Sequence, residues 1–195
     1  MNNVYLLGPH FEFDLNLDLQ QILAVVVKWE RILLQSGINY DKGNKRFDNG
    51  SLSTAYHNHF NLLTYTDPII IKLYNRLREE TQKILSRSEC YMIKSWINIY
   101  KPGDYISYHG HMTPDYDAVY GHIGIKNTNR TLTTYKNMET NETADWVNMD
   151  GKGQFSRPDL TRHRSWPQDS ERVTIGFDVI NVKHIKERTN YWVPL

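Results

Sequence analysis

The chain has 195 residues, of which 39% are hydrophobic and 12% aromatic, and this size suits a single domain, residues 1–195, with one core. No run approaches the roughly eighteen apolar residues of a membrane-spanning helix, and the N-terminus lacks the features of a signal peptide. A net charge of +1 argues against a long basic surface for nucleic acid, and the single cysteine excludes an internal disulfide and fits a cytoplasmic protein.

The N-terminal part, about residues 14–88, is predicted to be mainly helical. Alternating apolar residues predict a strand over 4–13, and apolar residues at helical spacing predict a helix over 17–35. Asp67 and Pro68 are the N-cap and first-turn residues expected of a second helix. The predicted apolar faces comprise Leu19, Ile22, Leu23, Val26, Ile32 and Leu33 in the first helix, and Ile70, Ile71, Leu73, Leu77 and Ile84 in the second.

The pattern changes to short alternating segments over about residues 90–182. A Pro-Gly turn over 101–104 separates the first two of these segments. Helices followed by many short strands predict an α+β domain, a β-sandwich or barrel supported by helices. The predicted strands cover residues 91–100, 105–111, 118–126, 131–136, 144–149 and 172–180.

Two histidines, His109 and His111, stand one residue apart in the second of these strands. Side chains at alternate positions of a strand face the same way, so the two imidazoles are expected to point into one space. Such a pair is half of a metal site, and a third ligand must come from elsewhere in the chain. His163 is the best candidate, although a lone histidine is ordinarily a surface residue.

The segment "INIYKPGDYISYHGH" (97–111) resembles the core strand pair of the 2-oxoglutarate/Fe(II)-dependent oxygenases, particularly the prolyl-hydroxylase-like members. The family pattern is a tyrosine, a Pro-Gly turn and a strand ending in His-x-Asp, then a distant histidine and a basic residue nine or ten positions later. A tryptophan strand before His-x-His, with Trp96 in that place, is closest to small uncharacterised members, many from phages and marine bacteria. The matching residues, within about 90–180, are Tyr100, Pro102, Gly103, His109, His163 and Arg172.

The resemblance implies a double-stranded β-helix (jelly roll) in which His109, His111 and His163 bind Fe(II). The usual second ligand is a carboxylate, and His111 stands in its place, which removes one negative charge. Imidazole nitrogens are still ligands that iron accepts. Asp115 and Asp117 remain alternatives, either as ligands or as partners that orient a histidine N–H.

The resemblance also implies 2-oxoglutarate as cosubstrate, together with O2 and a substrate that becomes hydroxylated. Arg172 is expected to bind the distal carboxylate of 2-oxoglutarate through its planar guanidinium, with Thr174 on the same strand face and the hydroxyl of Tyr100 nearby. The bland alternative for Arg172 is an exposed arginine paired with Glu171 or Asp169.

The substrate class is left open by the sequence. The family suggests a peptidyl proline or another amino-acid side chain, and a free amino acid or a nucleobase remains possible. Nucleic acid and membrane are not favoured as partners, and the expected location is the cytoplasm, which would be the host cytoplasm if the gene is phage-encoded.

Three other histidines and two other protein classes are alternatives to this interpretation. His57 and His59 form a second His-x-His that is expected to be a loop pair, and His122 is expected to be a packed or outer histidine rather than a ligand. One rival is a cupin-type metalloenzyme, with the same fold and ligands but no need for 2-oxoglutarate. The other rival is a metal-free jelly-roll binding or structural protein.

Overall fold

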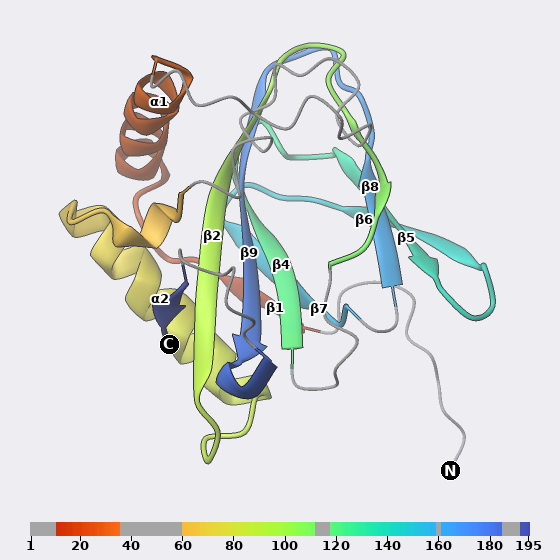
Figure 1. Ribbon diagram of the computed structural model, residues 1–195. Helices are drawn as coiled ribbons and strands as arrows, with labels where there is room; N and C mark the ends of the chain where they lie inside the picture. The colour runs from red at the N-terminus through yellow and green to blue at the C-terminus, as the bar shows by residue number, and fades with distance from the viewer. Residues whose placement is uncertain (1–10, 36–59, 112–117, 159–160, 185–191) are drawn as a thin grey trace.

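A computed structural model describes residues 11–35, 60–111, 118–158, 161–184 and 192–195. Two antiparallel sheets face one another, and two helices cover the outer face of the larger sheet (Figure 1). No helix in these ranges is both long and apolar enough to cross a bilayer.

The two long helices begin at aspartate side chains. Helix α1 (Leu19–Gln35) follows Asp18, whose Oδ1 accepts from the backbone N–H of Gln20 and Gln21 at 2.9 and 3.1 Å. The predicted start of α2 (Pro68–Ile84) is confirmed, because the Oδ1 of Asp67 accepts from the backbone N–H of Ile69. A 3-10 turn, η2 (Leu62–Thr64), precedes α2. Capping of this kind satisfies N–H groups that have no partner within the helix.

The predicted apolar faces of the helices are wrong at two positions. Ile32 is 42% exposed and Ile71 is 49% exposed. Helix α2 packs through Ile70 and the residues one and two turns beyond it. Ile71 lies about 100° further round the helix and therefore faces away from the core. The buried hydrophobic residues of α2 are Ile69, Ile70, Leu73 and Leu77.

The larger sheet has the order β1-β7-β4-β9-β2-β10 and the smaller sheet the order β3-β8-β5-β6. The strands of the larger sheet are β1 (Phe11–Asp14), β2 (Tyr91–Tyr100), β4 (Ala118–Lys126), β7 (Lys152–Ser156), β9 (Arg172–Asn181) and β10 (Val193–Pro194). Those of the smaller sheet are β3 (Ile106–His109), β5 (Leu132–Asn137), β6 (Thr143–Val147) and β8 (Thr161–Ser165), and a last 3-10 turn, η3, spans Val182–His184.

Most strand predictions are confirmed. Those over 105–111 and 144–149 each end two residues too late, since β3 stops at His109 and β6 at Val147. Two strands, β7 and β8, have no counterpart among the predictions. Of the strand predicted over 4–13, residues 4–10 lie outside the described part of the chain.

The two faces of the larger sheet differ in chemistry because β2 and β9 pair over ten residues and side chains alternate. One face contributes the apolar core against the helices, for example Ile93, Ile97, Ile175, Phe177 and Val179. The other face turns toward the smaller sheet and is rich in polar groups, among them Lys94, Asn98, Tyr120, His122, Arg172, Thr174 and Asp178. The space between the sheets is therefore lined by side chains that can bind a polar ligand.

Gly121 of β4 marks a close approach of two strands, and its replacement by alanine should destabilise the protein. A Cβ at this position would stand 1.8 Å from the backbone oxygen of Gln154 and 2.5 Å from the Phe177 ring. Because a backbone atom must move, the Gly121→Ala change should cost about 1–3 kcal/mol or more in free energy of unfolding, measured by urea titration. Gly110→Ala is the control, since among the described residues its Cβ would meet only the flexible side chain of Arg162, at 3.6 Å.

Candidate metal centre between the two sheets

Three histidines meet between the sheets. Two come from the neighbouring strands β3 and β8, and the third comes from the segment that follows β3. His109 ends β3 and is the register partner of His163 on β8, so the pairing of these two strands sets their separation. The ring centroid of His109 lies 5.4 Å from that of His111 and 4.3 Å from that of His163, and the His111 and His163 centroids are 5.2 Å apart. One ring nitrogen from each histidine lies within 4.8 Å of the other two. The structure thus brings together all three predicted ligands.

His111 reaches this position from beyond the end of β3 rather than from within the strand. Its ring is stacked on Tyr120 at 4.1 Å and 7°, and Trp96 stacks nearby at 6.0 Å. The aromatic side chains of the larger sheet therefore hold the His111 ring next to the other two rings. Strand alternation predicted that His111 would point toward the same space as His109. His111 does so, although it lies beyond the end of β3.

Hydrogen bonds decide which nitrogen of two rings can bind a metal. The Nδ1 of His109 lies 2.9 Å from the backbone oxygen of Ser107, and a carbonyl only accepts, so Nδ1 donates and Nε2 keeps the lone pair. The Nδ1 of His111 lies 2.5 Å from Oδ1 of Asp178, and the His111 Nε2 is buried without a hydrogen-bond partner among the described residues. In both rings Nε2 therefore carries the lone pair, and in His111 this nitrogen has no hydrogen-bond partner among the described residues.

His163 is a neutral imidazole. Burial lowers its pKa well below the usual range, and the nearby charges of His109, His111 and His122 lower the pKa further. Its Nδ1 is buried and has no hydrogen-bond partner within the described ranges. A buried ring nitrogen left unpaired is costly, and a metal ion would satisfy it. Three imidazole nitrogens suit iron, and they equally suit zinc, copper or nickel.

Arg172 is buried on the inner face of the larger sheet, with 2% of its surface exposed. Its guanidinium stacks over the ring of Tyr100 at 3.9 Å, and its Nε and Nη2 have no hydrogen-bond partner in the part of the chain described. Burial lowers the pKa of Arg172, while Tyr100 and Asp104 raise it. The side chain therefore offers two unsatisfied donors, the arrangement that binds a carboxylate bidentately.

The alternative of an exposed Arg172 paired with an acidic neighbour is wrong. Glu171 instead pairs with Lys126 at 3.0 Å. Thr174, two residues along the same face, is buried, and its Oγ1 accepts from Nδ2 of Asn98 at 3.1 Å. Arg172 and Thr174 thus line the interior as the alternation of β9 requires.

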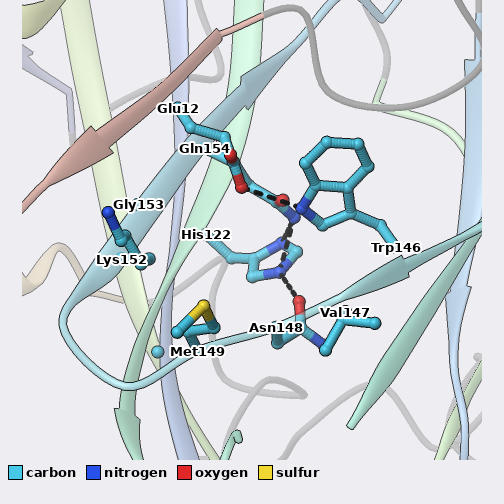
Figure 2. Close-up of a pocket in the computed structure, with 10 residues that line it drawn as sticks. Glu12, His122, Trp146, Val147, Asn148, Met149, Lys152, Gly153 and Gln154 are labelled. Carbon is cyan, nitrogen blue, oxygen red and sulfur yellow. Dashed lines mark hydrogen bonds between the residues drawn. The ribbon is translucent and has the colours of Figure 1, made fainter. Parts of the chain in front are cut away.

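His122 is a packed histidine, as predicted. Figure 2 shows it lining a small pocket between β4, β6 and β7, with Trp146 and Gln154 beside it. Its Nε2 lies 2.8 Å from Oδ1 of Asn148, and Nε2 of Gln154 lies 3.0 Å from its Nδ1 and 2.6 Å from its Nε2. Burial, together with the charges of Arg172 and His111, lowers the pKa of His122 to about 4 against the opposing effect of Asn148. Both nitrogens are engaged, which leaves none for a metal.

Asp178 is the site residue that the sequence reasoning missed. The signal for it was the alternation that starts at Arg172, since residues 172, 174, 176 and 178 share one face of β9. Four residues named at the sequence level, Asp115, Asp117, His57 and His59, lie outside the described residues.

No protein-family model and no curated protein sequence matches the chain. Solved structures do match in three dimensions. A prolyl-4-hydroxylase from Pseudomonas putida is 12% identical with a TM-score of 0.52, over 87% of this chain and 91% of that one. A prolyl hydroxylase from Trichoplax adhaerens, in complex with a peptide fragment of hypoxia inducible factor, is 15% identical with a TM-score of 0.58, over 89% and 84%.

The non-heme monooxygenase ThoJ, in a nickel complex, is similar to the chain at 14% identity and a TM-score of 0.57, over 87% of this chain and 72% of that one. Likeness at this level of identity concerns the fold. The predicted fold is confirmed: the chain is a double-stranded β-helix supported by N-terminal helices, as in the prolyl hydroxylases.

Proposed function

We propose that the chain is an Fe(II)- and 2-oxoglutarate-dependent dioxygenase that hydroxylates a C–H bond of its substrate. The observation that carries the proposal is the convergence of one nitrogen from each of His109, His111 and His163 within 4.8 Å between the two sheets. The fold shared with prolyl hydroxylases supports the same reaction class by analogy.

The three histidines would hold the metal through imidazole nitrogens and leave other coordination positions for cosubstrate and O2. When bound, iron supplies the chemistry in which 2-oxoglutarate is decarboxylated to succinate while a substrate C–H bond becomes C–OH. The neutral state of His163 serves this role, since a protonated imidazole has no lone pair to offer. Asp115 and Asp117 stay as predicted alternatives.

Arg172 would bind the distal carboxylate of 2-oxoglutarate with its two unsatisfied donors. Tyr100 holds the guanidinium from one side by stacking, which fixes the plane in which the donors lie. Thr174 would add a hydroxyl from the same strand face. The burial of this arginine distinguishes the proposal from a cupin-type metalloenzyme, which would share the three histidines but have no use for a carboxylate-binding cation at that place.

A side chain of a peptide or protein is the substrate class to test first. The Trichoplax adhaerens prolyl hydroxylase is bound to a peptide fragment, and its fold matches 89% of this chain. The proposed likeness to phage and marine-bacterial members, and the proposed cytoplasmic location, remain predictions.

The test is release of succinate from 2-oxoglutarate by the iron-loaded protein, with and without proline-containing peptides and free amino acids. We expect slow succinate release without substrate and faster release with one of them, together with a mass increase of one oxygen atom in that substrate. Tight iron binding without any binding of 2-oxoglutarate would favour the cupin-type alternative. Absence of iron binding would favour the metal-free jelly-roll protein.

A further inference from the structure

The carboxylate of Asp178 contacts the His111 ring at Nδ1, away from the unpartnered Nε2. The Oδ1 of Asp178 lies 2.5 Å from Nδ1 of His111, and the two side chains are 24% and 11% exposed. Asp178 comes from β9, where its register partners are Lys94 on β2 and Tyr120 on β4. The residue thus reaches the metal centre from the strand that also carries Arg172.

The stacking contacts of His111 leave one property of its ring undetermined. Tyr120 fixes the plane of the ring at 7° from its own plane, and Trp96 lies nearly parallel as well. A half-turn of the ring about its Cβ–Cγ bond would keep this plane, and therefore the stacking, but would exchange the nitrogen and carbon positions. The hydrogen bond to Asp178 selects one of the two orientations, and it also places the proton on Nδ1, which leaves Nε2 with the lone pair.

The charge of Asp178 also matters because the three candidate ligands include no carboxylate. Three neutral imidazoles would leave both positive charges of a divalent ion uncompensated, whereas a set with one carboxylate neutralises one of them. A carboxylate hydrogen-bonded to the far nitrogen of a ligand raises the basicity of that ligand and brings a negative charge close to the metal.

We propose that Asp178 is a positioning residue that orients His111 for the metal and supplies, from behind that ligand, the negative charge that His111 itself lacks. This inference rests on the proposed metal site, and it adds a residue that the sequence pattern of His-x-His does not contain. It assigns to Asp178 the orienting role that the sequence had suggested for Asp115 or Asp117.

Lys94 offers the competing explanation for Asp178. Burial lowers the pKa of Lys94, and the charge of Asp178 raises it, so the carboxylate also acts as a counter-charge for the buried lysine. The direct hydrogen bond of Asp178 is nevertheless to His111. A Lys94→Met variant separates the two roles, because positioning of His111 predicts that metal affinity survives this change.

The experiment compares Asp178→Asn with Asp169→Asn, an equal change of charge at an exposed position. We expect Asp178→Asn to bind Co(II) and, under anaerobic conditions, Fe(II) about 10–100-fold more weakly than the unmodified protein. The visible spectrum of bound Co(II) should also change, because the ligand field of His111 changes. Asp178→Glu, which keeps the carboxylate, should recover part of the affinity, and Asp169→Asn should match the unmodified protein in both measurements.

Two results would overturn the inference while leaving the proposed metal centre standing: unchanged Co(II) affinity and spectrum in Asp178→Asn, or an equal loss of affinity in Lys94→Met. Should Asp178→Asn fail to fold, as judged by circular dichroism, the same comparison is made with Asp178→Glu, whose metal affinity must then differ from that of Asp169→Asn. Failure of the unmodified protein to bind Co(II) or Fe(II) would instead count against the proposed function itself.

Discussion

His163→Ala should remove metal binding and turnover together, the largest effect of any single change that we expect. The variant loses one of three protein ligands, so the fall in metal affinity should exceed the roughly 10–100-fold attributed to loss of an outer hydrogen-bond partner. The strand itself should persist, because residue 163 pairs through its backbone with His109 on β3 and Tyr135 on β5. Loss of metal should therefore occur in a folded protein.

The measurement is anaerobic titration with Fe(II), followed by the rise in melting temperature that bound metal produces. Metal that binds the native state and not the unfolded state raises the melting temperature of the unmodified protein. This rise should be absent in His163→Ala. His184→Ala, at a histidine in the η3 turn, is the matched control and should keep both the rise and the turnover. If His163→Ala binds iron as tightly as the unmodified protein, the three-histidine site is not the metal centre.

The larger sheet was mostly predictable because its strands alternate in a way that a hydrophobic core requires. Strand β2 was predicted with its bounds, and β9 to within one residue. Strands β7, "KGQFS", and β8, "TRHRS", contain few apolar residues, and nothing in their own sequence indicates a strand. They become strands because β4 and β5, respectively, offer them unpaired edges, a contribution of tertiary structure that outweighs local propensity.

The sequence predicted the three histidines that meet between the sheets but missed Asp178, which contacts one of them, for a related reason. His109 and His111 are close in the sequence, and Asp115 and Asp117 were proposed as partners because they are close too. Asp178 is 67 residues away from His111 and stands within an apolar strand, so only the register of β9 against β4 brings it to the ring. Contacts that depend on strand register are not visible in a local pattern.

Arg172→Met should weaken 2-oxoglutarate binding while leaving iron binding intact, the second large effect that we expect. Methionine is long enough to keep most of the packing but has neither charge nor donors. Removing one partner of a buried, hydrogen-bonded charge pair costs about 2–5 kcal/mol, which corresponds to about 30-fold or more in affinity. The measurement is anaerobic titration of the iron-loaded protein with 2-oxoglutarate, followed through the visible charge-transfer absorption of the complex.

Two further variants identify the origin of this effect. Arg172→Lys keeps the charge and loses the planar pair of donors, so its affinity for 2-oxoglutarate should lie between those of the unmodified protein and Arg172→Met. Arg162→Met makes the same substitution at an exposed arginine of β8 and should leave affinity unchanged. Equal affinity in Arg172→Met and the unmodified protein would contradict the assignment of this residue to the cosubstrate.

Arg172→Met should leave the stability of the ligand-free protein unchanged or raise it, although it weakens ligand binding. Arg172 is 2% exposed and has two donors unpaired in the described structure, so its charge carries a desolvation cost that the fold bears in the absence of a ligand. Arg172→Met relieves that cost, so the ligand-free variant should unfold at the same or a higher urea concentration than the unmodified protein. A residue that lowers the stability of the empty protein but raises its affinity for ligand is retained for binding. If Arg172 were retained for the fold, Arg172→Met would instead lower both the stability of the ligand-free protein and its affinity for 2-oxoglutarate.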